Sequence, residues 1–212
     1  MVAANSPLLS ARDLTCERDY RRLFAPVSID VAPGDALQLA GPNGMGKTSL
    51  IKVLAGLMLP AEGQLSYPGL NNDPRQDLLY IGHRTGLKPE LTPLENLRWL
   101  AGLRLGKFDT AKAQSALEQL GIGHKQDQPV FQLSAGQQRR VALTRLFLEP
   151  ARLWLLDEPF TAIDRSGVQL LEERFAQHQQ SGGAVLLTTH QPLSMHLSVK
   201  ALALEPSTEA DN

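Results

Sequence analysis

Apolar residues along the chain fall into short alternating or continuous runs that predict β-strands. Val27, Ile29 and Val31 alternate with polar residues, which indicates a strand with one face in water. Residues 153–156 and 184–188 form nearly continuous apolar runs, as is typical of strands buried on both faces of a parallel sheet. Further strands are expected at 8–16, 36–40, 64–67, 78–81 and 201–204.

Capping residues mark the expected starts of helices. Thr92 and Glu95 are spaced as a capping box around Pro93, and proline is favoured at the first helical position. A cap at Asp109 or Thr110 begins a second helix. The apolar set of the helix after Thr92 is Leu94, Leu97, Trp99, Leu100 and Leu103. Other helices are expected at 49–57, 138–146 and 168–180, whereas 17–22 should form a polar turn and 69–76 a loop.

The order of these elements predicts an α/β fold. Strands alternate with helices at both ends of the chain, which favours a mainly parallel core sheet covered by helices. Only helical patterns occur between about residue 84 and residue 132, so we expect a small helical subdomain inserted there. The expected organisation is a single domain over 1–212, with its core at 1–83 and 133–206, the helical subdomain at about 84–132 and a polar tail at 207–212.

Composition narrows the class of protein. The formal net charge is -1 and the pI is about 6.5, so bulk positive charge does not hold this chain on nucleic acid. Cys16 is the only cysteine, which excludes an internal disulfide and favours a reducing compartment. The chain has no apolar run of membrane-spanning length and no signal-peptide pattern at its start. We therefore expect a soluble protein that reaches a membrane only through a partner.

Candidate chemistry begins with a glycine-rich stretch between an expected strand and an expected helix. Residues 41–48 fit the pattern G-x-x-x-x-G-K-[ST] at every fixed position, in the context that a phosphate-binding loop requires. The helix N-terminus adds N–H groups and partial positive charge. Lys47 should reach the β- and γ-phosphates of a nucleotide, and the Thr48 hydroxyl should bind Mg²⁺. The expected nucleotide-binding residues are Gly41, Pro42, Asn43, Gly44, Met45, Gly46, Lys47, Thr48 and Ser49.

Two carboxylates follow the expected buried strand at 153–156. Functional sites of open α/β sheets gather at the carboxyl ends of the strands, which is where Asp157 and Glu158 stand. Asp157 is the expected partner of Thr48 in holding Mg²⁺, acting through water. Glu158 is the expected general base that polarises the attacking water. Taken alone, the pair is also compatible with a solvated acidic turn.

A second helix end with the character of an anion site begins at Ser134. Ser134 and Gln137 form a capping box, and Gly136 lies in the first turn of the helix that follows. The chain already contains a complete phosphate loop. A second phosphate-facing helix end therefore makes sense if it serves a nucleotide held by another copy of the chain. A helix that is merely well capped is the alternative.

Taken in order, the motifs resemble those of the ATP-binding cassette (ABC) ATPases over nearly the whole chain. Residues 41–48 are similar to the Walker A loop of that family, and 153–158 to its Walker B strand with the catalytic glutamate. Residues 133–137 are similar to its signature sequence, with Ala135 in place of the first glycine. The resemblance implies a P-loop NTPase fold with an antiparallel β subdomain, and ATP and Mg²⁺ as ligands.

The same resemblance implies roles for single residues. Asp164 stands in the D-loop of the family, and His190 stands at its switch histidine. His83 occupies the place of a usual glutamine. An imidazole can contact the attacking water, but Mg²⁺ favours oxygen ligands, so a direct bond from His83 to the metal is not expected. Tyr20 is the candidate, by position alone, for the aromatic residue that stacks on adenine, and a plain surface tyrosine is the alternative.

The exact residues within and around these motifs resemble one subfamily. Residues 80–83, 133–143, 157–164 and 188–193 are similar to the ATPase subunits of bacterial cytochrome c maturation. This resemblance implies a homodimer bound peripherally to integral membrane permease subunits, at the cytoplasmic face of the bacterial inner membrane. It also implies that hydrolysis powers haem export or the release of a haem-loaded chaperone, so haem and the chaperone are indirect partners. Nucleic acid is not an expected partner.

Two other functions stay open on the sequence alone. One is an ATPase subunit for another exported solute, such as a lipid or lipoprotein, and only the fine motif wording argues against it. The other is a soluble ATPase acting on ribosomes or in iron–sulfur cluster assembly. Co-purification from membranes would separate these functions, since each has different partners.

Overall fold

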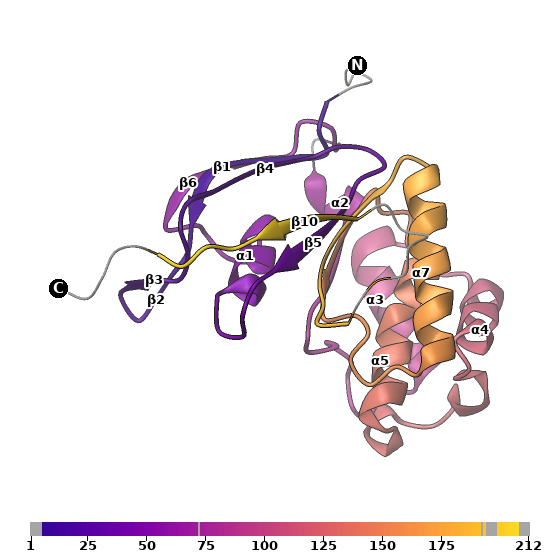
Figure 1. The fold of residues 1–212 in the computed structure, drawn as a ribbon. Helices are drawn as coiled ribbons and strands as arrows, with labels where there is room; N and C mark the ends of the chain where they lie inside the picture. The colour runs from indigo at the N-terminus through magenta and orange to yellow at the C-terminus, as the bar shows by residue number, and fades with distance from the viewer. Residues whose placement is uncertain (1–5, 72, 192, 194–198, 208–212) are drawn as a thin grey trace.

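The computed structural model describes residues 6–71, 73–191, 193 and 199–207. Its centre is a five-stranded sheet with the strand order β10-β5-β9-β8-β7 (Figure 1). The pairs β10–β5, β5–β9, β9–β8 and β8–β7 are all parallel, which confirms the predicted core sheet. The strands are β5 (Ala36–Ala40), β7 (Leu78–Ile81), β8 (Leu153–Asp157), β9 (Ala184–Thr188) and β10 (Val199–Ala203).

A second, antiparallel sheet has the order β4-β1-β6 and consists of β1 (Leu9–Thr15), β4 (Val27–Val31) and β6 (Glu62–Ser66). Side chains of β4 alternate between buried and exposed, as predicted. The polar turn predicted for 17–22 is right only at its centre. Asp19 and Tyr20 form the turn with positive φ angles of 52° and 62°, and the residues on either side pair as β2 (Glu17–Arg18) and β3 (Arg21–Arg22).

Capping side chains begin several of the helices. Thr92 and Glu95 form the predicted capping box, and Asp109 accepts a hydrogen bond from the backbone N–H of Lys112. The loop predicted for 69–76 is wrong at its end, because Asp73 caps a short helix there. The helices are α1 (Lys47–Leu54), α2 (Pro74–Asp77), α3 (Pro93–Leu105), α4 (Thr110–Gln119), α5 (Ala135–Leu143), α6 (Arg145–Leu148) and α7 (Arg165–Gln180), with 3₁₀ turns η1 (Gly123–Lys125) and η2 (Val130–Gln132).

Alternation along the parallel strands divides the interior into two cores. Leu153 and Leu155 pack with α1 and the antiparallel sheet, whereas Trp154 and Leu156 pack with α4, α5 and α7. Figure 1 shows α5 and α7 together on one side of the sheet and the antiparallel strands on the other. Because strand side chains alternate between faces, one continuous apolar run serves both cores.

The apolar face predicted for α3 is partly wrong. Leu97 is buried, but Trp99 is 37% exposed and Leu103 is 70% exposed. The polar residue Asn96 takes an inward position instead, and its side-chain amide donates to the carbonyls of Lys88, Leu91 and Thr92. Buried amides need such partners. Trp99 follows Leu97 by two residues, or about 200° around the helix, so the two side chains cannot both face the core.

Within the residues that the structure describes, no helix has both the length and the apolar content needed to cross a bilayer. The polar tail predicted for 207–212 lies outside the described residues except for Ser207.

The bulkiest buried side chain of the second core, Trp154, stacks on a histidine. The rings of Trp154 and His178 are parallel with centroids 3.6 Å apart, and His178 Nε2 lies 3.2 Å from the carbonyl oxygen of Arg152. Gly183 leaves room for the imidazole, since a Cβ at that position would clash with the ring. Burial, and then the nearby charge of Arg174, lowers the pKa of His178 to about 4.

This lowered pKa predicts an acid-dependent loss of stability. Between pH 6.5 and about 4, His178 is protonated in the unfolded chain but not in the folded chain. The contribution of neutral His178 to the free energy of unfolding is therefore complete above pH 6.5 and is lost as the pH falls toward 4. The amount is on the order of 3 kcal/mol. In His178→Gln, the free energy of unfolding in urea should fall less steeply between pH 7 and pH 4. Equal pH slopes for the two proteins would contradict the role of His178.

Candidate functional site

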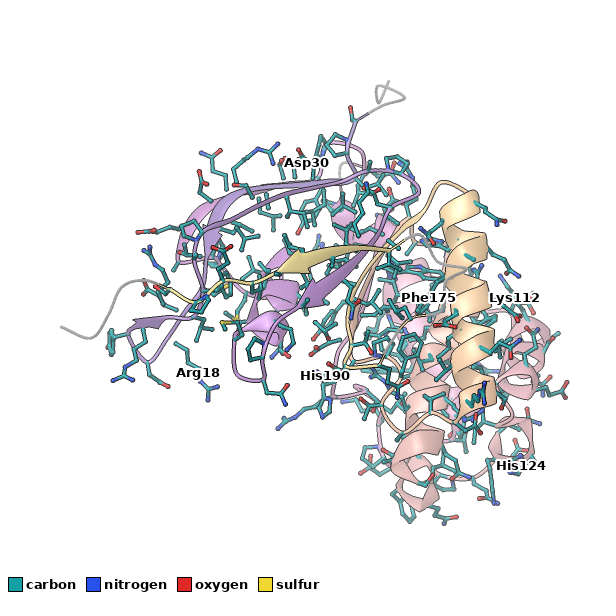
Figure 2. All side chains as sticks on the ribbon, viewed as in Figure 1. Arg18, Asp30, Lys112, His124, Phe175 and His190 are labelled. Carbon is teal, nitrogen blue, oxygen red and sulfur yellow. The ribbon has the colours of Figure 1, made fainter. Side chains whose placement is uncertain are left out.

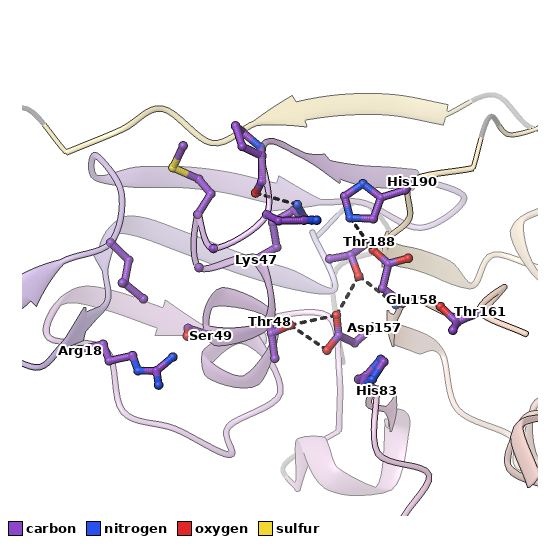
Figure 3. Close-up of a pocket in the computed structure, with 16 residues that line it drawn as sticks. Arg18, Lys47, Thr48, Ser49, His83, Asp157, Glu158, Thr161, Thr188 and His190 are labelled. Carbon is purple, nitrogen blue, oxygen red and sulfur yellow. Dashed lines mark hydrogen bonds and ion pairs between the residues drawn. The ribbon is translucent and has the colours of Figure 1, made fainter. Parts of the chain in front are cut away.

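A pocket of about 470 Å³ lies where the carboxyl ends of the parallel strands meet the N-terminus of α1 (Figure 3). It collects segments that are far apart in the sequence, because the ends of β5, β7, β8 and β9 lie at one edge of the sheet. The predicted residues that line it are Pro42, Asn43, Gly44, Met45, Gly46, Lys47, Thr48, Ser49, His83, Asp157, Glu158 and His190.

The glycine-rich loop wraps around the side chain of Lys47. Lys47 is buried, and its Nζ donates to the carbonyls of Gly41 at 2.5 Å and Pro42 at 2.9 Å. Gly46 has a φ of 87°, which favours glycine, and a Cβ there would lie 2.9 Å from the Phe24 ring. Since Gly46 caps α1 without a side chain, the first N–H groups of that helix are free of a capping oxygen and suit an anion.

A hydroxyl–carboxylate–hydroxyl chain crosses the floor of the pocket. Thr48 Oγ1 donates to Asp157 Oδ2 at 2.9 Å, and Thr188 Oγ1 donates to Asp157 Oδ1 at 2.8 Å. Asp157 is 1% exposed. The hydroxyl of Thr48 and the carboxylate of Asp157 are hard oxygen donors from two different segments, and such donors suit Mg²⁺. This donor set therefore fits the metal that the sequence predicts.

Glu158, next to Asp157, has an unusual backbone conformation. Its φ is 52°, in the left-handed region that costs free energy for a residue other than glycine. Its backbone N–H donates to Thr188 Oγ1 at 2.9 Å. Its Oε1 lies 3.4 Å from His190 Nε2. Figure 3 marks this contact with a dashed line. The carboxylate thus faces the pocket, where it can accept a proton from water.

His83 follows β7 and lies at the boundary of two cavities. It lines the pocket beside Asp157 and also a neighbouring cavity of about 800 Å³. That second cavity lies between residues 83–87, the start of α5 and Thr161–Ala162. His83 therefore lines both cavities.

The residues predicted around the second helix end lie outside the pocket. Ser134 and Gln137 form the predicted capping box, with Ser134 N–H donating to Gln137 Oε1 at 2.9 Å. Gly136 packs so closely that a Cβ there would lie 2.5 Å from the carbonyl oxygen of Ala162. Asp164 caps α7 and forms an ion pair of 2.7 Å with Arg140 of α5. Within the single chain, these residues join α5 to the segment after Glu158.

Tyr20 lies away from the pocket, and Arg18 lines it instead. Tyr20 is fully exposed at the tip of the β2–β3 hairpin, whereas Arg18 lies on the other side of the phosphate loop from His190 (Figures 2 and 3). Sequence reasoning also missed Leu23, Thr161 and Thr188 as lining residues. Thr188 had no local sequence signal, because its place opposite Asp157 is seen only in the folded sheet. No sequence signal separated Arg18 from the other arginines of the hairpin.

Comparison with known proteins relates the chain to one family. A family described as ABC transporter matches residues 24–161. The cytochrome c biogenesis ATP-binding export protein CcmA of Yersinia pseudotuberculosis is 53% identical over 192 residues, which cover 88% of this chain and 87% of the relative. The protein of the same name in Escherichia coli strain K12 is 50% identical over 193 residues, which cover 89% and 91%. A solved dimeric structure of a bacterial ABC transporter cassette is 22% identical, with a TM-score of 0.76 over 92% of this chain and 94% of that chain, and shows the same fold.

The position of Arg18 leads to a prediction about nucleotide affinity. A guanidinium at the rim of the pocket can stack on a base, and such contacts are worth about 0.5–2 kcal/mol. Arg18→Ala should therefore weaken ATP binding about 2- to 30-fold. Tyr20→Ala is the matched control from the same hairpin and should change the Kd by less than about twofold. Fluorescence titration with a labelled ATP analogue measures both. The opposite ranking would restore Tyr20 as the base-stacking residue.

Proposed function

The chain belongs to the ABC transporter family, and we propose that it is the ATP-hydrolysing subunit of a membrane export complex in cytochrome c biogenesis. The observation that carries this function is the convergence of Lys47, Asp157 and Glu158 in one pocket. The names of relatives that are 50–53% identical support cytochrome c biogenesis over export of another solute.

Each polar group of the pocket has a role in this proposal. Lys47 and the N–H groups of the phosphate loop bind and orient the phosphates of ATP. Thr48 and Asp157 would hold Mg²⁺, which supplies neutralisation of the phosphate charge. Glu158 accepts a proton from the attacking water, and His190, 3.4 Å from it, orients that water and the carboxylate. His83, which also lines the pocket, contacts the same water.

Homodimerisation completes the site in this proposal. The N-terminus of α5, with Ser134 exposed as its cap, lies outside the pocket of its own chain. A two-fold, head-to-tail pair would place Ser134, Gly136 and Gln137 of one copy against the nucleotide of the other, with Asp164 at the same interface. ATP would then bind between Lys47 of one copy and Ser134 of its partner.

The proposed membrane partner is an integral permease. This chain would bind to it as a peripheral subunit, on the cytoplasmic face of the inner membrane. The cavity of about 800 Å³ beside His83 is the proposed docking place, and Leu87 lines it. Leu87 and Leu94 also pack against the second core, so these two leucines stabilise the fold as well. Haem export, or the release of a haem-loaded chaperone, is the proposed output of the complex.

Glu158→Gln tests the hydrolytic role. The amide keeps the shape of the side chain but cannot accept the proton, so turnover should fall about 10²- to 10⁴-fold. The affinity for ATP should stay within about twofold, because the phosphate-binding groups are intact. In cells, the variant should co-purify with the membrane fraction and fail to support cytochrome c assembly. Wild-type turnover by the purified variant complex, or normal cytochrome c assembly, would refute the proposed function.

Ser134→Arg tests the shared site. A long cation at this helix end would block closure of the two copies, so hydrolysis should fall at least about 10²-fold, as expected when an aligned reacting geometry is lost. ATP binding by the single chain should persist, because Ser134 lies outside its own pocket. Analytical ultracentrifugation with ATP should show a dimer for the wild type and a monomer for the variant. Full activity in a strictly monomeric preparation would exclude the shared site.

A further inference from the structure

A buried arginine lies directly beneath the hydrolytic residues. Arg139, in the middle of α5, is only 4% exposed. Its Nη1 donates to the carbonyl of Gly82 at 2.6 Å. Its Nη2 donates to the carbonyls of Asp157 at 2.7 Å and Glu158 at 2.8 Å, and its Nε donates to that of Pro159 at 3.4 Å. One side chain thus connects α5 to the segments that follow β7 and β8.

Three of the four carbonyls that Arg139 binds lie beyond the ends of their strands, and the fourth belongs to Asp157, the last residue of β8. Gly82 follows the end of β7, and Glu158 and Pro159 follow the end of β8, so the parallel ladder no longer supplies donors to them. Buried carbonyls without partners are costly, and they need donors from elsewhere. A guanidinium carries five N–H donors in a flat fork and can reach several carbonyls at once. A lysine ammonium donates from a single point and cannot span the same set.

Burying the charged guanidinium of Arg139 costs desolvation free energy, and this cost suggests a role for Arg139 beyond packing. Desolvation by burial lowers the pKa of Arg139 to about 10, although Asp157 and Glu158 act in the opposite direction. The guanidinium is therefore charged at neutral pH while it lies among main-chain carbonyls. Buried charges are often replaceable by apolar residues without loss of stability, so a charge kept in such a place suits a demand for a defined geometry.

The main chain that carries Glu158 is held from two sides. Its N–H donates to Thr188 Oγ1, and its carbonyl accepts from Arg139 Nη2. These two contacts hold the left-handed φ of 52° that turns the Glu158 carboxylate toward His190. The same guanidinium holds Gly82, the residue before His83. Loss of Arg139 would therefore release the backbone under both hydrolytic side chains while leaving the phosphate loop unchanged.

We propose that Arg139 is a positioning residue for ATP hydrolysis, which fixes Glu158 and His83 relative to α5 through the carbonyls of Gly82, Asp157 and Glu158. Arg139 does not line the pocket, so it acts through the main chain and not by touching the nucleotide. The inference rests on the proposed ATPase function. In this proposal, the residue that positions Glu158 and His83 belongs to α5, the helix capped by Ser134, and does not line the nucleotide pocket.

The test compares the buried Arg139 with the half-buried Arg174 in the assembled complex. Arg139→Met removes every donor and keeps an unbranched side chain, whereas Arg139→Lys keeps the charge. Arg174→Met is the matched control, because Arg174 also donates to a main-chain carbonyl, that of Leu146, and burial also lowers its pKa. Arg174 lies over the ring of Trp154 and does not line the nucleotide pocket. For each variant, kcat, the Kd for ATP, the nucleotide-binding stoichiometry and Tm are measured.

Arg139→Met should lower kcat about 10- to 100-fold, the usual effect of misplacing catalytic groups by about an ångström. Its Kd for ATP should stay within about twofold, and its binding stoichiometry should match the wild type. Arg139→Lys should recover part of kcat. Arg174→Met should lower Tm with kcat close to the wild-type value. An Arg139→Met protein that turns over as fast as Arg174→Met would overturn the proposal.

Two further outcomes distinguish a positioning role of Arg139 from an effect on folding and from a failure of the proposed ATPase function. If Arg139→Met fails to bind nucleotide stoichiometrically, Arg139→Lys decides, since a full wild-type kcat with lysine shows that only the charge is needed and refutes positioning. If the wild-type complex itself hydrolyses no ATP, the proposed function fails before any variant is compared. If the wild-type, Arg174→Met and Arg139→Met complexes are all equally active, the positioning role of Arg139 is rejected and the proposed ATPase function stands.

Discussion

Parallel pairing in the central sheet is the constraint on which the rest of the molecule depends. Because β5, β9, β8 and β7 all run in one direction, their carboxyl ends open onto a single edge. The phosphate loop, the acidic pair, His190 and His83 each follow one of these strands. A reversed strand would send its loop to the opposite edge, so the composition of the pocket follows directly from the direction of the strands.

The polar groups at this edge depend on one another. Asp157 accepts hydrogen bonds from Thr48 and Thr188, and Thr188 in turn accepts one from the N–H of Glu158. Arg139 closes the arrangement from below by binding the carbonyls of Asp157 and Glu158. Buried polar networks are rigid when every member has a partner, and this one links three strand ends and two helices.

Sequence reasoning predicts the parts of this site that are contiguous in the chain. The phosphate loop and the acidic pair are recognisable because their chemistry needs neighbouring residues in fixed order, and the flanking strand and helix can be read from apolar runs. Thr188 and Arg139 act on residues that lie 31 and 18 positions away, so no local pattern marks them. Arg18 and Tyr20 belong to the same hairpin, and only the folded hairpin shows that Arg18 lines the pocket while Tyr20 is exposed. On α3, Trp99 and Leu103 are exposed although they are apolar, and the polar Asn96 is buried.

The two bonds of the Thr188 hydroxyl bear on how this chemistry could be transplanted. That hydroxyl donates to Asp157 and accepts from Glu158, yet it comes from the adjacent strand β9. A designer who moves the phosphate loop and the acidic pair onto another parallel sheet would carry over the recognisable motifs and leave this oxygen behind. The portable unit is therefore a pair of adjacent strands in fixed register, with a hydroxyl on the second strand opposite the aspartate of the first.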